Sequence, residues 1–267
     1  MIRILTLAAL GLVGPSPPPA QPVSLPVQQD EAETAAERFS RLEAEATEAM
    51  SAWRKNLSEL RKAAAEGGPA VPEEAWLSPY TDLVPHFSEA ASEYAGTTDA
   101  IPFLVWLASN ATNLPEPSGK IGVGALRDLL TTHASSPQLE DISYLLGRLD
   151  YHFGAEEAQQ LLAGVEKKTT STTVRAWAIY ARLTPTLDEA AVDSEEFQAA
   201  KRELLAAMEG VEDRYLTTDA SNKIEVRERF SLGMVAPDIK GIDLDGTAFS
   251  LSDYEGKVLF VDFWGDW

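Results

Sequence analysis

The chain has 267 residues with a hydrophobic fraction of 45%, which is typical of a globular protein, and its 42 Asp and Glu against 22 Lys and Arg give a formal net charge of −20. This acidity argues against binding to nucleic acid or to an anionic membrane surface, because both need a basic face. The absence of cysteine excludes a disulfide framework, a thiolate metal site and thiol chemistry within these residues.

The N-terminus is typical of an export signal. Arg3 is the only charged residue before Asp30, and an apolar run from Ile4 to Val13 follows it. That run is too short to span a bilayer, which takes about 20 helical residues, but it suits the apolar region of a signal peptide. We predict a signal peptide over residues 1–20, a proline-rich linker over 21–29 and an exported protein, periplasmic or extracellular, with no membrane span after signal removal. The alternative is a cytoplasmic chain with an apolar start.

Residues 30–66 have the pattern of one long amphipathic helix. Asp30 followed by Glu33 resembles a capping box, and apolar residues then recur at alternating steps of four and three. Gly67-Gly68-Pro69 ends the pattern. Such a helix would be about 54 Å long at 1.5 Å per residue and needs a partner surface. That surface is either a later helix or a second copy of the chain, which would make a homodimer through the Asp30–Glu66 helix.

Further helices are predicted between turn signals, and no strand-like alternation occurs between Glu31 and Thr218. Ser194 can cap the last of them. The pattern predicts an irregular helical bundle over residues 30–228, without the repeat of a tetratricopeptide solenoid. The predicted helices cover Tyr80–Tyr94, Ala100–Thr112, Gly124–Thr132, Gln138–Leu149, Ala155–Lys167, Thr173–Leu183 and Glu195–Tyr215.

Candidate chemistry in the helical region is sparse, and no cofactor or metal site is predicted there. Three histidines lack the spacing of metal ligands and are interpreted as surface or core residues: His86, His133 and His152. Acidic groups at helix starts are interpreted as favourable to the helix dipole rather than as catalytic pairs: Glu140-Asp141, Glu156-Glu157 and Asp193–Glu196. Four large aromatic residues are predicted in the core: Trp53, Trp76, Trp106 and Trp177.

The pattern changes after Glu228. Asp238–Leu244 and Thr247–Leu251 are predicted to pair as a hairpin around Asp245-Gly246, a dipeptide favoured in tight turns. A single helical turn, Ser252–Gly256, follows. The next residues are nearly all β-formers, which predicts a strand buried on both faces over Val258–Trp264.

Asp262 places an ionisable group in this predicted strand. A carboxylate buried there is costly unless it is paired, which makes Asp262 a candidate functional residue. From the pattern alone, the alternative of a strand end that faces water stays open.

These C-terminal residues together resemble the opening of the thioredoxin-like redoxins exported by bacteria, of the TlpA and ResA type, and less closely the AhpC/TSA peroxiredoxins. Both begin with a glycine, Ala-Pro-Asp, a hairpin, a Leu-Ser-Asp-Tyr turn and Gly-Lys before the first long strand. The corresponding residues here are Gly233, Ala236-Pro237-Asp238, Asp245-Gly246, Leu251–Tyr254 and Gly256-Lys257. The resemblance covers about 35 of the 267 residues.

The resemblance implies that residues 229–267 begin an incomplete α/β thioredoxin-like fold, cut just before the Cys-x-x-Cys of the family. In the intact parent, the first cysteine would attack a disulfide as a thiolate and the second would resolve the mixed disulfide. By resemblance, Asp262 is the buried acid that exchanges a proton with the resolving cysteine, and Trp267 flanks the active-site loop. The partners would be protein thiols and disulfides or a thioredoxin-type reductant, and the 267-residue chain itself would be inactive.

Two other functions stay open from the sequence. The helical domain can be a binding or dimerisation module with a non-catalytic redoxin remnant. The parent can also be a peroxiredoxin-like peroxide reductase, which a single cysteine after Trp267 would distinguish from the Cys-x-x-Cys of disulfide exchange. Phe263-Trp264-Gly265 favours the thioredoxin side, because peroxiredoxins usually have Phe-x-Pro after this strand.

Overall fold

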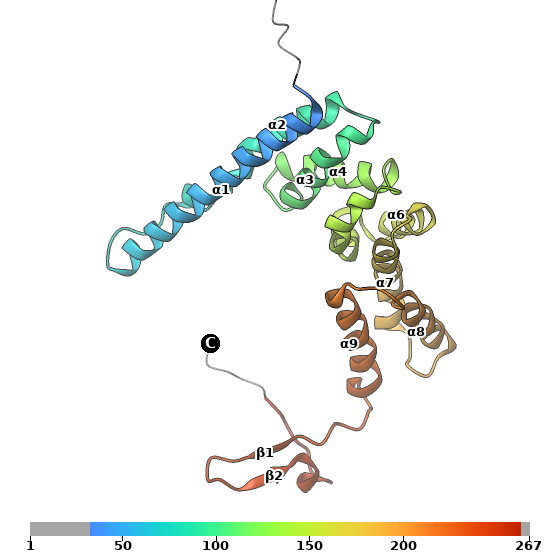
Figure 1. Cartoon of the computed structure of the whole chain (residues 1–267). Helices are drawn as coiled ribbons and strands as arrows, with labels where there is room; N and C mark the ends of the chain where they lie inside the picture. The colour runs from blue at the N-terminus through green and yellow to red at the C-terminus, as the bar shows by residue number, and fades with distance from the viewer. Residues whose placement is uncertain (1–32, 263–267) are drawn as a thin grey trace, which may run out of the picture. The chain divides into compact units, whose positions relative to one another are not determined.

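The computed structural model describes residues 33–262, so the predicted signal peptide, the linker, Asp30 and Trp267 lie outside the described residues. The chain divides into two units, Met1–Glu33 and Thr34–Trp267. In the described part, nine α-helices precede one antiparallel two-stranded sheet (Figure 1). This confirms the predicted fold class, a mainly helical domain followed by a partial β element.

The α-helices follow one another along the chain, some of them joined by 3-10 segments. The α-helices are α1 (Ala35–Ala65), α2 (Tyr80–Glu93), α3 (Ile101–Ala111), α4 (Ser118–Thr131), α5 (Leu149–Phe153), α6 (Ala155–Lys168), α7 (Thr172–Glu189), α8 (Glu195–Ala207) and α9 (Arg214–Phe230). The 3-10 segments are η1 (Glu73–Trp76), η2 (Thr98–Ala100), η3 (Pro137–Arg148) and η4 (Leu251–Tyr254), and the strands are β1 (Lys240–Ile242) and β2 (Ala248–Ser250).

Most helices pack on those next to them in the chain. Helix α1 packs on α2, α2 on α3, α3 on α4, α6 on α7, and α7 on both α8 and α9. The segment η3 packs on both α3 and α7, so it joins the earlier helices to the later ones. No helix within residues 33–262 is long and apolar enough to cross a membrane.

The start of α1 differs from the prediction. Thr34 is its N-cap, because the backbone N–H of Glu37 donates to the Thr34 hydroxyl at 3.3 Å and the Thr34 N–H donates to the Glu37 carboxylate at 2.9 Å. Helix α1 therefore starts later than predicted, with a capping box of the same spacing, whereas Asp30 of the predicted box lies outside the described residues. The predicted end is confirmed, with Gly67 at a φ of 91°.

Helix α4 starts six residues before the predicted Gly124. Its glycines lower the intrinsic helix propensity of the segment. The sequence pattern therefore does not indicate the first two turns of α4. One of these glycines, Gly122, is buried where α4 crosses α3, and an added Cβ there would lie 2.4 Å from the backbone nitrogen of Thr112. Packing on α3 therefore decides the start of this helix.

Three other predicted helices need correction. The segment predicted as Gln138–Leu149 is mainly the 3-10 segment η3. Helix α7 continues through Pro185 because Leu187 is anchored in the core. The predicted helix Glu195–Tyr215 is two helices, because Gly210 adopts a φ of 74° and Asp213 caps a new helix, α9. Ser194 caps α8 as predicted.

The core is continuous from α1 to α9 and is rich in aromatic side chains. Phe87 stacks on Trp106 with ring centroids 3.6 Å apart. Trp106 and Trp177 are buried as predicted, whereas Trp53 is half-buried and donates its ring N–H to the carbonyl of Ala75 at 2.9 Å. Trp76 is 53% exposed, so its predicted core position is wrong; it lies in η1, which has no buried residue.

Candidate functional site

The predicted hairpin forms around Asp245-Gly246. Strands β1 and β2 pair antiparallel with Lys240 opposite Ser250, although each strand is shorter than predicted. The carboxylate of Asp243 accepts from the backbone N–H of Asp245 at 3.0 Å and of Thr247 at 2.8 Å. Gly246 adopts a φ of 82°, which a glycine reaches without strain.

The Ala-Pro-Asp and Leu-Ser-Asp-Tyr motifs meet beside this hairpin. The backbone N–H of Ser252 donates to the carboxylate of Asp238 at 3.0 Å, and that bond holds the pKa of the Asp238 carboxyl below its usual value. Asp253 accepts from the N–H of Ser250 at 2.8 Å in a capping box that starts η4. Both motifs therefore act here as structural ties.

The segment after the hairpin forms no strand within the described residues. No strand pairs with residues 258–262 within the described part of the chain, and Val258 and Phe260 are 102% and 94% exposed. The predicted strand buried on both faces is therefore not formed there, because a strand is buried only when neighbouring strands and helices cover it. Asp262 is exposed rather than buried for the same reason. Its catalytic role and that of Trp267 remain predictions.

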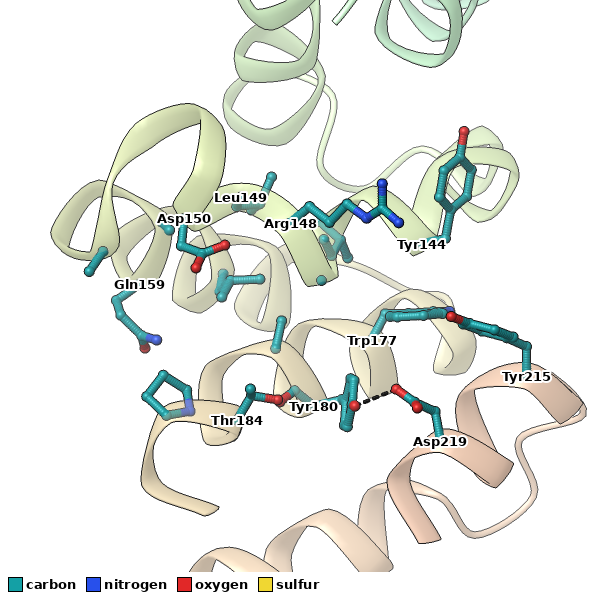
Figure 2. Close-up of a pocket in the computed structure, with 17 residues that line it drawn as sticks. Tyr144, Arg148, Leu149, Asp150, Gln159, Trp177, Tyr180, Thr184, Tyr215 and Asp219 are labelled. Atoms are coloured by element: carbon teal, nitrogen blue, oxygen red, sulfur yellow. Dashed lines mark hydrogen bonds between the residues drawn. The ribbon is translucent and has the colours of Figure 1, made fainter. Parts of the chain in front are cut away.

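A second candidate site lies in the helical domain. A cavity of about 460 Å³ opens between η3, α5, α6, α7 and α9 (Figure 2). Its volume falls within the range of small-molecule sites, roughly 300 to 1,000 Å³. The lining is more apolar and aromatic than charged, with a few polar groups on opposite sides.

One side of the cavity is built by α7 and α9. Trp177 stacks beside Tyr215 with ring centroids 6.1 Å apart, and its ring N–H donates to the carboxylate of Asp213 at 2.9 Å. The hydroxyl of Tyr180 donates to the carboxylate of Asp219. Burial, reinforced by that hydrogen bond, raises the pKa of Tyr180 well above its usual value, so Tyr180 stays neutral. This side is therefore fixed by two bonds that join α7 to α9.

The opposite side comes from the end of η3, α5 and α6. Arg148, Asp150 and Gln159 lie there, across the cavity from Tyr180 and Asp219 (Figure 2). The guanidinium of Arg148 makes no hydrogen bond or ion pair with any described residue.

Near this side, His152 has an altered acidity that gives a testable pH dependence. Burial, together with the charge of Arg148, lowers the pKa of His152 below 6.5. The unfolded chain then binds more protons than the folded one, so stability should fall as the pH drops below about 6.5. We expect His152→Gln to flatten this slope in urea unfolding between about pH 5 and 7.5. His86→Gln, at an exposed histidine, is the control, and an unchanged slope in His152→Gln would contradict the assignment.

Sequence reasoning missed this cavity. It placed Trp177 in the core, but it did not single out Tyr180 or Asp219, which are 39 residues apart. The local signal was the spacing of Trp177 and Tyr180 on one helical face. The spacing of Tyr215 and Asp219 became visible only once α9 was known to run from Arg214 to Phe230.

The other predicted site residues are dispersed. Within residues 33–262, no group of His, Asp and Glu is arranged to hold a metal ion. His133 is buried, and its Nε2 atom has no hydrogen-bond partner in that part of the chain. Glu156-Glu157 and Glu195-Glu196 lie in the first turns of α6 and α8, where the helix dipole favours negative charge.

Comparison with known proteins gives a partial similarity. No family model matches the chain, and no solved structure matches it. The chain is similar to two curated proteins, the thiol-disulfide oxidoreductases ResA of Bacillus thuringiensis subsp. konkukian and of Bacillus cereus. Each is 40% identical over 40 residues, which is 15% of this chain and 23% of the relative. The chain therefore spans less than a quarter of the length of these relatives.

Proposed function

We propose that residues 229–267 are the opening part of a thioredoxin-like domain and that the whole protein is an exported thiol–disulfide oxidoreductase. The observation that carries this proposal is the 40-residue similarity to ResA, which is close in length to the segment with the redoxin motifs. The hairpin at Asp245-Gly246 and the tie between Asp238 and Ser252 support it, since they give those motifs a definite fold. The helical domain over residues 30–228 would then precede the redox domain.

The coding sequence beyond Trp267 tests this proposal. We expect Cys-x-x-Cys directly after Trp267, and we expect the longer product to reduce insulin disulfides with dithiothreitol as the reductant. The 267-residue chain, which has no thiol, should show no turnover. A longer product with a single cysteine that reduces hydrogen peroxide would instead support the peroxiredoxin alternative. Turnover by the 267-residue chain would contradict the proposal outright.

The role of Asp262 can be tested in the same longer product. If Asp262 exchanges a proton with the resolving cysteine, Asp262→Asn should slow the resolving step and shift the pH–rate profile. Glu255→Gln is a control at an exposed residue of the same segment. An unchanged rate and profile in Asp262→Asn would remove this residue from the mechanism.

Helix α1 favours a second candidate function, association of two copies. Small side chains line an exposed groove on this helix: Ser40, Ala44, Thr47 and Ser51. Along this groove, Glu43 lies toward the N-terminal end, Glu48 near the middle and Lys55 at the C-terminal end. We propose that two α1 helices pair antiparallel through this face, because that arrangement places Glu43 of one copy near Lys55 of the other.

Light scattering of the whole chain tests this pairing. We expect a dimer, weakened by Glu43→Lys or Lys55→Glu and restored when both changes are combined, because the double variant recreates opposite charges. A monomer at high concentration, or a double variant no better than the single ones, would overturn it.

A further inference from the structure

Arg148 lines the cavity, and within the described residues no acidic side chain pairs with it. Arg182, for comparison, binds both Glu166 and Glu203. The guanidinium of Arg148 has five N–H donors in a planar fork that matches a carboxylate. It therefore offers the cavity an unused site for an anionic group.

The facing side offers the opposite chemistry. Asp219 receives the Tyr180 hydroxyl on one carboxylate oxygen, and no lysine or arginine of the described residues lies within salt-bridge distance of it. The Tyr180 hydroxyl already donates its hydrogen bond to Asp219, and the Thr184 hydroxyl donates to the backbone carbonyl of Tyr180 at 2.9 Å. Neither hydroxyl has a second hydrogen to donate to a ligand. What remains on this side is a set of hydrogen-bond acceptors next to a negative charge, which suits an ammonium group.

The space between the two sides is apolar. Leu149 and Leu162 contribute to it from α5 and α6, and Trp177 from α7. The packing of these helices and the ring contact of Trp177 with Tyr215 hold the cavity walls in place. A molecule with a charged group at each end and an apolar part between them would match these three parts of the lining.

We propose that this cavity binds a short peptide by both free ends, with its carboxylate on Arg148, its amino group on Asp219 and an apolar side chain against Trp177. Arg148 and Asp219 lie on opposite sides of the cavity (Figure 2). A free amino acid carries both charged groups on one carbon, whereas the ends of a dipeptide lie about 7 Å apart. Because its charged ends are separated along the chain, a dipeptide suits charged groups on opposite sides of the cavity better than a free amino acid does.

Calorimetric titration of the 267-residue chain with leucyl-leucine tests the proposal. N-acetyl-leucyl-leucine, which lacks the amino charge, and leucyl-leucine amide, which lacks the carboxylate, should each bind at least about tenfold more weakly. Leucine should also bind more weakly than the dipeptide. Absence of dipeptide binding, equal binding of the blocked peptides, or leucine binding as tight as that of the dipeptide would each overturn the proposal.

Two variants assign the ends. Asp219→Asn should lose the preference for the free amino group, and Arg148→Gln should lose the preference for the free carboxylate. Asp219→Asn should keep its affinity for N-acetyl-leucyl-leucine, and Arg148→Gln should keep its affinity for leucyl-leucine amide. A misfolded variant could not give this result. Arg54→Gln, at another arginine without an acidic partner in the described residues, should bind like the unaltered chain. Loss of the amino-group preference in Asp150→Asn instead of Asp219→Asn would overturn the assignment.

Discussion

Gly122→Ala should destabilise the helical domain by about 3 kcal/mol, the upper end for overpacking of a well-packed site. An added Cβ at Gly122 would lie 2.4 Å from the backbone nitrogen of Thr112, and 2.6 and 2.9 Å from the carbonyl carbon and Cβ of Ala111. These are mostly backbone atoms at the end of α3, so the clash is relieved only if α3 and α4 move apart. Urea unfolding followed by circular dichroism measures the change.

Gly124 provides a matched control two residues along the same helix. An added Cβ there meets nothing within 4 Å. Gly124→Ala should therefore stabilise the domain by up to about 1 kcal/mol, since alanine favours a helix over glycine. If both alanine variants changed stability in the same direction and by the same amount, the close approach of α3 and α4 would be contradicted.

Phe87→Ala should cost about 4 kcal/mol of unfolding free energy, as expected for truncation of a buried aromatic residue. Phe87 is fully buried, stacks on Trp106, and lies edge-on to Phe39 at 6.2 Å and to Phe103 at 6.4 Å. Removal of its ring leaves a cavity that joins α1, α2 and α3, and none of these helices can fill it without moving.

Phe230→Ala is the comparison for this truncation. Phe230 ends α9 and is 56% exposed, so its loss should change stability by less than about 0.5 kcal/mol. Thermal or urea unfolding of the two variants under identical conditions gives the contrast. A cost below about 1 kcal/mol for Phe87→Ala would show that the aromatic cluster does not hold these helices together.

Local chemistry made part of the fold predictable. Asp245-Gly246 specifies a tight turn, and the hairpin formed there. Ser194 caps a helix whose first turn is acidic, and α8 began there. In both cases the decisive interaction joins residues within a few positions of each other, so it is visible in the sequence.

Other features depend on contacts between distant residues. The apolar spacing of Met208, Val211 and Tyr215 continues the stripe of α8, which concealed the break at Gly210. Both Met208 and Val211 pack against the core, although they lie between two helices. A periodic pattern reports which residues are buried, but it does not report whether the backbone between them stays helical.

The cavity was the least predictable feature. Its two charged sides come from Arg148 and Asp219, 71 positions apart, and only the packing of η3 and α9 around α7 brings them to one space. The C-terminal segment presents the converse case. Its motifs were evident from the residues, but the burial of Asp262 depends on sheet neighbours that residues 33–262 do not supply.

The connection between the helical domain and the hairpin is short. Arg227 donates to the carbonyls of Leu187 and Ala190 at 2.8 and 2.7 Å, which fixes the end of α9 to the end of α7. The hydrogen bonds that hold the hairpin segment begin at Asp238, so only residues 232–237 connect it to the helical domain. Fully extended, these residues span about 20 Å. A tether this short raises the effective concentration of one part around the other to the millimolar range. The hairpin and the helical domain would therefore encounter each other often, even without a stable contact between them.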